Sequence, residues 1–314
     1  MSEGVYHYVD GLCVNHLFQE RTLRSAFSYQ PRPDDVFIVT YPKCGTTWMQ
    51  FIVFCIYNDG KTPADLLEFM KRTPFLEMVG ADVAEKMPRP GAIKTHLPYH
   101  LQPKSPDARY IYVARNPYDC CVSLYHHTKL FPIHDFEDGT FDEFFERFLR
   151  GEVDFGDYFD HLLSWFEHRN DDNVLFLTYE HLKRDPKNGI LSVARFLGKD
   201  YEEKLLRDHG ALEKVVEATS HESMKKFNAE FRKLGSAVGA FLREKGGASE
   251  EEVLSERLQT LLSKPITGEF VRKGIVGDWK NHFSGEQIRR LKEVIAKRPK
   301  ALELMSLWKD CELP

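Results

Sequence analysis

The amino-acid sequence predicts an α/β protein with a central parallel β-sheet flanked by helices. Short apolar runs, rich in β-branched and aromatic residues, alternate with longer segments of helical periodicity, which is the pattern of βαβ units. No internal repeat and no change in composition divides the 314 residues, of which 42% are hydrophobic. We therefore expect one domain over residues 1–314, with its ligand site at the carboxyl ends of the strands.

Four apolar runs are expected to form the buried strands of this sheet. Each is short and is bounded by polar or turn-forming residues, as strands are. The runs are residues 36–40, 92–95, 110–114 and 174–178.

Helices are expected between and after these strands. Thr46 and Thr47 open one that runs to about residue 58. A second begins after the third strand, where Asn116 can cap the helix and Pro117 suits its first position.

Three more helices are indicated later in the chain. Phenylalanines at helical spacing predict a helix over residues 140–151 that faces the core, and residues 158–168 repeat the pattern. The third begins at Ser284, which forms a capping box with Gln287.

The composition argues against a function that needs a basic surface or a membrane. The formal net charge is −5, so no nucleic-acid partner is expected. No signal peptide is recognisable, and the longest apolar run is far shorter than the roughly 20 residues that span a bilayer. Six cysteines without metal-like spacing indicate free thiols and no metal site. We expect a cytoplasmic protein, because that compartment is reducing.

The stretch TYPKCGTTWMQ, residues 40–50, directly follows the first predicted strand. Pro42 ends the strand because it cannot donate to the ladder, and Gly45 permits a positive φ or a close backbone approach. The helix that opens at Thr46 offers free N–H groups, and Lys43 adds a positive charge. This strand–loop–helix resembles a phosphate-binding loop, without the Walker A spacing. The alternative is an ordinary junction with a solvated lysine.

A cation and a histidine meet at the end of the second strand. Lys94 and His96 point to the same side, because side chains alternate along a strand. A histidine with a pKa near neutrality can take a proton from a hydroxyl group. A structural histidine bonded to a nearby carbonyl is the alternative.

Two further segments contribute cations. Arg115 ends the third strand and suits bidentate phosphate binding, unless it pairs with Asp119. Arg272 and Lys273 stand beside Gly274, which frees the backbone for close contact. Together with Lys43 and Lys94, these cations predict a ligand with more than one phosphate-like group, facing a base.

On these motifs the chain resembles the cytosolic sulfotransferases. The family signature Tyr-Pro-Lys-Ser-Gly-Thr-Thr-Trp corresponds to residues 41–48, and Lys-Thr-His-Leu-Pro to residues 94–98. Arg-Asn-x-x-Asp-x-x-x-Ser corresponds to residues 115–123, and Arg-Lys-Gly-x-x-Gly-Asp-Trp to residues 272–279. The segments LFLTYEHLKRDP and TSHESMKK match two further blocks, and all occur in the family's order.

The resemblance implies a donor, 3′-phosphoadenosine 5′-phosphosulfate (PAPS), with 3′-phosphoadenosine 5′-phosphate (PAP) as product. His96 would be the general base of an in-line displacement, and Lys94 and Lys43 would stabilise the developing charge. Ser123 would bind Lys43 until the acceptor arrives. The implied contacts are Lys43, Cys44, Gly45, Thr46, Thr47 and Trp48 at the phosphosulfate, Arg115, Ser123, Arg272, Lys273 and Gly274 at the 3′-phosphate, and Trp48, Tyr179, Thr219, Met224 and Phe270 around the adenosine.

Three features depart from the family pattern. Cys44 replaces a serine, and its place beside Lys43 at a helix N-terminus suggests a lowered thiol pKa, with a passive replacement as the favoured alternative. His221 occupies a position that is usually aromatic and should stack less well on adenine. The family dimer motif keeps Lys280 but changes three other residues, so we expect a monomer or a weak homodimer.

The acceptor is expected to be a small hydroxylated molecule, a phenol or an aromatic amine. The predicted walls of its pocket are Phe18, Lys94, His96, Tyr125, His126, Phe131, the helix over residues 141–148 and an acidic segment at residues 246–256 that we expect to be a mobile loop running into a short helix. For the phenylalanines of residues 141–148, packing in the core is the favoured alternative. Catecholamines, hydroxysteroids and other alcohols remain open. Competing functions are a nucleotide or nucleoside kinase-like phosphotransferase, which should carry Walker A, and a nucleotide-binding module without catalysis.

Overall fold

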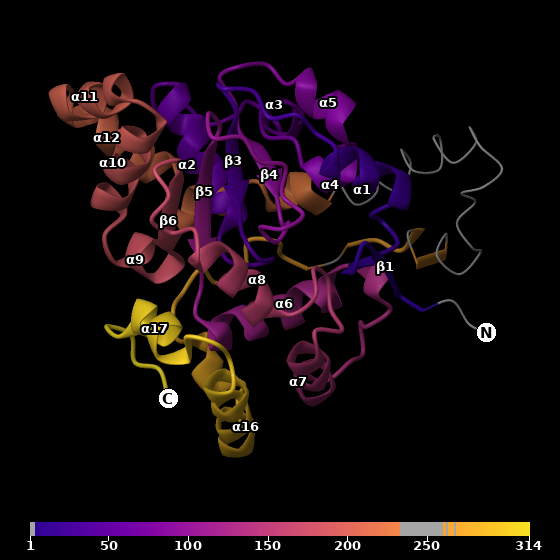
Figure 1. The fold of residues 1–314 in the computed structure, drawn as a ribbon. Coiled ribbons are helices and arrows are strands. Elements are labelled where there is room, and N and C mark those ends of the chain that lie inside the picture. Colours follow the sequence, from indigo (N-terminus) through magenta and orange to yellow (C-terminus); the bar gives the residue numbers. More distant parts are fainter. Residues whose placement is uncertain (1–3, 233–259, 262, 267) are drawn as a thin grey trace.

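The central sheet has four parallel strands in the order β4-β3-β5-β6 (Figure 1). The computed structural model describes residues 4–232, 260–261, 263–266 and 268–314. The strands are β3 (Val36–Val39), β4 (Ile93–Thr95), β5 (Arg109–Ala114) and β6 (Val174–Thr178). All four predicted strands are confirmed, each within one residue at either end. The segment predicted as a mobile loop, residues 246–256, lies outside the described residues.

Alternating side chains of the strands divide the core into two layers. Phe37 and Val39 pack on one face of the sheet, while Val36 and Ile38 pack on the other. Both faces are therefore buried, which explains why the strands read as continuous apolar runs. The helices of the second layer, seen on the left in Figure 1, are α2 (Thr46–Tyr57), α9 (Tyr179–Arg184), α10 (Pro186–Leu197), α11 (Lys199–Arg207) and α12 (His209–Ala218).

The opposite face of the sheet is covered by elements from residues 20–166. Their buried side chains form one continuous cluster with Phe37 and Tyr112. These elements are α1 (Glu20–Phe27), α4 (Leu76–Val79), α5 (Ala81–Glu85), α6 (Pro117–Leu130) and α8 (Tyr158–Phe166). An antiparallel hairpin of β1 (Tyr6–Val9) and β2 (Leu12–Asn15), which was not predicted, packs at the edge of this layer.

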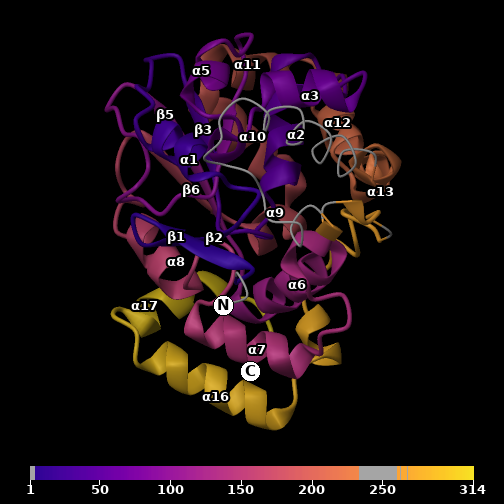
Figure 2. The same ribbon diagram turned by 90° about the vertical axis from the view of Figure 1, so that its right-hand side faces the viewer.

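The C-terminal helices form the end of the molecule farthest from α11, as Figure 2 shows. There α7 (Phe141–Arg150) packs against α16 (Gly285–Ala296). Both helices begin with a capping box, Thr140 with Glu143 in α7 and the predicted pair of Ser284 with Gln287 in α16. Phe144, Phe145 and Phe148 are buried, so the prediction that this phenylalanine stripe faces the core is confirmed. Among the described residues, the remaining elements are α3 (Leu66–Arg72), α13 (His221–Lys225), α17 (Ala301–Met305) and three short 3-10 turns, Pro132–His134, Asp278–Asn281 and Ser306–Trp308.

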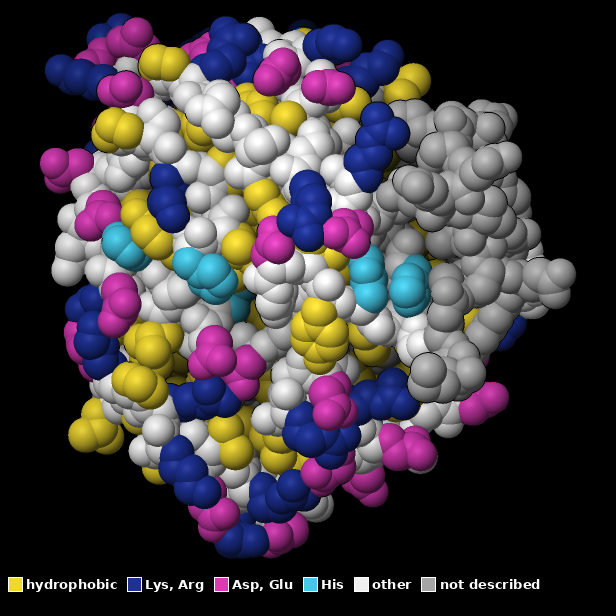
Figure 3. Space-filling model, turned by 45° about the vertical axis from the view of Figure 1, so that its right-hand side comes forward, with side chains coloured by type: hydrophobic (Ala, Val, Ile, Leu, Met, Phe, Trp, Pro, Cys, Tyr) yellow, Lys and Arg dark blue, Asp and Glu magenta, His cyan; other side chains and the backbone are white. Residues whose placement is uncertain are grey.

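The surface carries charges of both signs. On the face in Figure 3, lysines and arginines are interspersed with aspartates and glutamates. Within the described ranges, no helix is long and apolar enough to cross a membrane.

Candidate active site

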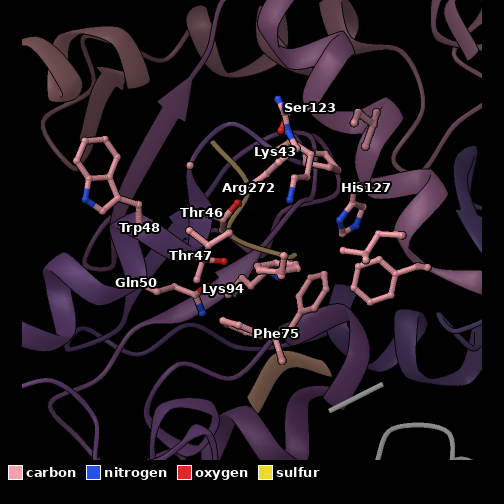
Figure 4. Close-up of a pocket in the computed structure, with 18 of the residues that line it drawn as sticks. Lys43, Thr46, Thr47, Trp48, Gln50, Phe75, Lys94, Ser123, His127 and Arg272 are labelled. Atoms are coloured by element: carbon pink, nitrogen blue, oxygen red, sulfur yellow. The ribbon is translucent and has the colours of Figure 1, made fainter. Parts of the chain in front are cut away.

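A cavity of about 560 Å³ opens where the carboxyl ends of the strands meet. Figure 4 shows side chains from several separate segments converging on it. The predicted site residues that line it are Phe18, Lys43, Gly45, Thr46, Thr47, Trp48, Lys94, His96, Arg115, Ser123, Phe131, Tyr179, Thr219, Met224, Phe270, Arg272, Lys273 and Gly274. The fold therefore brings all but two of the predicted site residues, Cys44 and Tyr125, to a single cavity.

The loop between β3 and α2 has the backbone of an anion site. Lys43 and Gly45 both adopt positive φ, at 69° and 106°. A Cβ on Gly45 would lie 2.9 Å from the ring of Tyr179, so this position requires glycine. No side chain caps the first turn of α2, whose N–H groups therefore remain available.

His96 is held in one tautomer by the strand beside it. Its Nδ1 lies 2.8 Å from the carbonyl oxygen of Thr40, which can only accept, so Nδ1 carries the proton. Nε2 is therefore an unprotonated base. Burial, together with the charge of Lys94, holds the pKa of His96 well below its usual value. The imidazole is thus neutral at physiological pH and ready to accept a proton.

The backbone of His96 is anchored on both sides. Its N–H donates to Oε1 of Glu77 at 2.5 Å, and its carbonyl accepts from Nε2 of His161 at 3.0 Å. Thr95 donates its hydroxyl to the same Glu77 oxygen. Burial raises the pKa of Glu77 to about 7, against the opposing effect of these hydrogen bonds.

Two lysines share the cavity with this base. Burial and then the neighbouring cations lower the pKa of Lys43 to about 7. Burial lowers the pKa of Lys94 to about 8, although Glu77 acts in the opposite direction. Each ammonium group lies over an aromatic ring. The Lys43 ammonium is 4.4 Å from the ring centroid of Phe270, and the Lys94 ammonium is 3.8 Å from that of Phe75. Both lysines would be stabilised as cations by an anionic ligand.

The predicted hydrogen bond between Ser123 and Lys43 is not formed. Ser123 lines the cavity on α6, while the Lys43 ammonium lies over Phe270. The guanidinium of Arg115 donates to the carbonyls of Lys43 and Ile275, each at 3.2 Å, and its buried Nε has no hydrogen-bond partner. It forms no ion pair with Asp119, which instead accepts from backbone N–H groups of the 277–279 segment and from Asn116.

Arg272 and Lys273 are oriented by a buried carboxylate. Both lie 2.7 Å from Asp278, whose side chain is only 1% exposed. Although burial opposes ionisation, the hydrogen bonds from Lys273 and Arg272 hold the pKa of Asp278 well below its usual range. A Cβ on Gly274 would lie 2.5 Å from the ring of His221, and Nε2 of this histidine donates to the Arg272 carbonyl at 3.2 Å. His221 therefore supports the basic turn as well as lining the cavity.

A family model described as "Sulfotransferase domain" matches residues 33–255 and 248–309. The chain belongs to the sulfotransferase family. It is 37% identical to "Sulfotransferase 1 family member D1" of Mus musculus over 86% of this chain and 85% of that protein. It is 34% identical to "Amine sulfotransferase" of Oryctolagus cuniculus, over 93% and 89% respectively. The crystal structure of mouse sulfotransferase SULT7A1 complexed with PAP has a TM-score of 0.70 and 30% identity, covering 96% of this chain and 99% of that one.

The cysteine of this sulfotransferase's loop does not behave as the sequence suggested. Cys44 does not line the cavity and is 1% exposed, with its Sγ 3.7 Å from that of Cys120. Burial raises the pKa of the Cys44 thiol well above its usual value, so the expectation of a lowered pKa was wrong. Desolvation outweighs the favourable charge of the helix N-terminus because the side chain points into the core behind the loop.

Tyr125 is the second predicted residue that lies outside the cavity. The face of α6 that lines the cavity carries Ser123, His126 and His127, at helical spacing i, i+3 and i+4. Tyr125 is two positions from Ser123 and so points to another side, where its ring packs against Phe141. The acceptor-wall prediction for this residue was therefore wrong.

Several residues of the site escaped the sequence interpretation. Phe75, from the segment beside β4, lines the cavity, as do Phe155 and Asp154 from the turn before α8. Glu77 does not line the cavity but accepts the backbone N–H of His96. No local motif marked them, because only packing brings these segments to the strand ends. Within the part of the chain that the structure describes, no three His, Cys, Asp or Glu side chains are grouped so as to hold a metal ion.

Proposed function

We propose that this sulfotransferase moves the sulfuryl group of PAPS to a hydroxyl of a small acceptor, with His96 as the general base. The observation that carries the proposal is the hydrogen bond from His96 Nδ1 to the Thr40 carbonyl, which leaves Nε2 unprotonated in a cavity with two buried lysines. The likeness to mouse sulfotransferase SULT7A1, which was crystallised with PAP, supports the choice of donor. A kinase-like phosphotransferase is disfavoured, because the loop lacks Walker A.

The residues of the cavity fit such a donor. The Nε of Arg115 is buried without a partner. Burial lowers the pKa values of Lys43 and Lys94, so an anionic ligand would stabilise their charged forms. Arg115, Ser123, Arg272, Lys273 and Gly274 would hold the 3′-phosphate. Lys43, Thr46 and Thr47 would hold the phosphosulfate, while Trp48, Tyr179, Thr219, Met224 and Phe270 would surround the adenosine. When bound, PAPS would supply the sulfuryl group to be transferred.

The chain's own groups would then handle proton and charge. His96 accepts the acceptor's proton at Nε2, and the Thr40 carbonyl stabilises the imidazolium that forms, because it receives the Nδ1 proton. Lys94 and Lys43 stabilise negative charge as it moves, and they do so strongly because their surroundings are largely shielded from water. The rings of Phe75 and Phe155 pack against the His96 ring in T-shaped contacts and help to exclude water.

We place the acceptor among phenols and aromatic amines. Phe18, Phe75, Phe131 and Phe155 line the cavity, and such a lining suits a flat aromatic molecule. The resemblance to "Amine sulfotransferase" is in keeping with this class.

From its family, we further propose that the enzyme works in the cytoplasm. We also propose that residues 1–314 act as one domain and that the enzyme is a monomer or a weak dimer.

The test measures sulfate transfer from labelled PAPS to a panel of phenols, aromatic amines and hydroxysteroids. His96→Ala should lower kcat at least about 100-fold, while PAP still binds in calorimetry. His100→Ala, which changes an exposed histidine outside the cavity, is the matched control and should keep full activity. Undiminished turnover in His96→Ala would remove this residue from its role, and absence of PAP binding to the unmodified enzyme would overturn the proposal as a whole.

A further inference from the structure

We infer that His127 of α6 is a specificity-determining residue that hydrogen-bonds a second polar group of the acceptor. The preferred acceptor is then a flat aromatic molecule that carries a second hydroxyl or carbonyl oxygen besides the hydroxyl that is sulfated. This inference rests on the proposed function and deepens it.

The position of His127 places it in the acceptor part of the cavity. It lies one turn beyond Ser123 on the face of α6 that lines the cavity. Its ring contacts Phe131, at 4.6 Å between centroids, and Phe270, at 5.9 Å. Figure 4 shows the imidazole pointing toward the same space as Lys43 and Lys94.

His127 differs from the other histidines of this region in its hydrogen bonding. His96, His134 and His161 each have a partner at Nδ1, namely a backbone carbonyl or a tyrosine hydroxyl. His126, which precedes it, meets His282 through Nε2 at 3.0 Å. Nδ1 of His127 is buried without a partner, and neither of its nitrogens has a hydrogen bond within the described ranges. The other histidines near the cavity are therefore positioned by the protein, whereas His127 is left for a ligand.

An unpartnered imidazole is unfavourable in the folded protein. A buried polar group that makes no hydrogen bond loses the interaction that it had with water. Apolar rings such as Phe131 would serve the packing equally well at this position. An acceptor oxygen that hydrogen-bonds to His127 would restore the lost interaction. The enzyme should therefore discriminate more strongly in favour of acceptors that carry this oxygen than it would through a solvent-exposed contact.

The charge state of His127 defines the kind of group that it recognises. Burial, and then the charges of Lys43 and His134, hold its pKa well below the usual value, with Lys94 and His96 adding to the effect. A neutral imidazole has one N–H donor and one acceptor nitrogen. It therefore suits a neutral hydroxyl or a carbonyl. The nearby lysines disfavour a positively charged group at the same place.

The experiment compares phenol with its three dihydroxy analogues, catechol, resorcinol and hydroquinone, as acceptors. The unmodified enzyme should prefer at least one of the three to phenol in kcat/KM. His127→Phe should lower kcat/KM for that analogue about tenfold while changing it less than about threefold for phenol, because only the analogue loses a hydrogen bond. His127→Asn keeps a donor and an acceptor near the position of Nδ1 and should restore part of the preference. His100→Phe controls for the introduction of a phenylalanine.

The outcomes separate this inference from the proposed function. If the unmodified enzyme sulfates phenol but His127→Phe reduces phenol and the dihydroxy analogues by the same factor, His127 is structural and the inference is wrong. The absence of any preference for a second hydroxyl in the unmodified enzyme has the same consequence. If PAP binds but none of the tested acceptor classes is sulfated, both the acceptor assignment and this inference fail.

Discussion

The imidazole Nδ1 of His96 lies 2.8 Å from the carbonyl oxygen of Thr40, across two neighbouring strands. β3 and β4 pair with Val39 opposite Thr95, so the next residue of each strand is brought to the same edge. The pairing of two strands therefore selects the tautomer of the histidine. This relationship makes Nε2 the basic nitrogen without any contribution from a side-chain carboxylate.

Glu77→Gln should shift the alkaline limb of the pH–rate profile to lower pH. The carboxylate raises the pKa of Lys94, and the amide that replaces it can still accept from the His96 N–H but carries no charge. Lys94 would then lose its proton at a lower pH, and with it the charge that the reaction needs. Profiles of kcat/KM between pH 6 and 10 measure the shift. An unchanged alkaline limb would show that Glu77 serves only as a hydrogen-bond acceptor.

PAP binding should be accompanied by proton uptake near pH 8. Lys43 and Lys94 have pKa values of about 7 and about 8, so both are partly or largely deprotonated there, and an anion binds better to their charged forms. Affinity should therefore fall as the pH rises from 7 to 9, by up to about tenfold per unit for each proton taken up. Calorimetry in buffers of different ionisation enthalpy measures the uptake. Lys104→Met, on the surface, should leave it unchanged, and a heat independent of the buffer would contradict the prediction.

Arg272→Ala should weaken the binding of PAP more than the binding of adenosine 5′-phosphate. Arg272 is held by Asp278 at the rim of the cavity, where we propose that the 3′-phosphate binds. The loss of a charged hydrogen bond should lower PAP affinity by roughly 10- to 100-fold, with little effect on the nucleotide that lacks this phosphate. The exposed Arg195→Ala is the control. If the binding of both nucleotides is weakened equally, Arg272 contacts a part of the ligand other than the 3′-phosphate.

Gly45→Ala should destabilise the enzyme and abolish tight PAP binding. The new Cβ would have to tolerate a φ of 106° and lie 2.9 Å from Tyr179, so we expect a loss of about 1–3 kcal/mol in the free energy of unfolding. Gly285→Ala is the matched control, because no atom lies within 4 Å of a Cβ there and the residue opens α16. Its unfolding free energy should stay within about 0.5 kcal/mol of the unmodified enzyme or rise. Urea denaturation gives both values, and similar effects for the two variants would refute the packing argument.

Cys44 should resist alkylation by iodoacetamide in the folded enzyme, with or without PAP. It is buried and its thiol pKa is raised, so little thiolate is present and the reagent has no access. Cys311, which is partly exposed, should react sooner. Mass spectrometry of the digested protein locates the label, and unfolding in urea should make Cys44 reactive. Native labelling of Cys44 that PAP prevents would restore the idea of a reactive loop cysteine.

Much of the site was predictable from the sequence because its signals are local. A proline that ends a strand, a glycine at a positive φ and alternating side chains place Lys43, Gly45 and His96 without knowledge of distant contacts. Parallel strands share one carboxyl edge, so these residues are expected to lie close together, and the structure places all of them at one cavity.

The remaining properties were decided only by the tertiary structure. Local motifs do not show that Glu77 accepts the backbone N–H of His96, that Cys44 points into the core, or that His127 rather than Tyr125 faces the cavity. The protonation states were equally hidden, because they depend on how completely distant segments shield a group from water. The sequence by itself determined which chemical groups gather at the sheet edge, whereas packing between segments far apart in the chain decided their orientation and their charge.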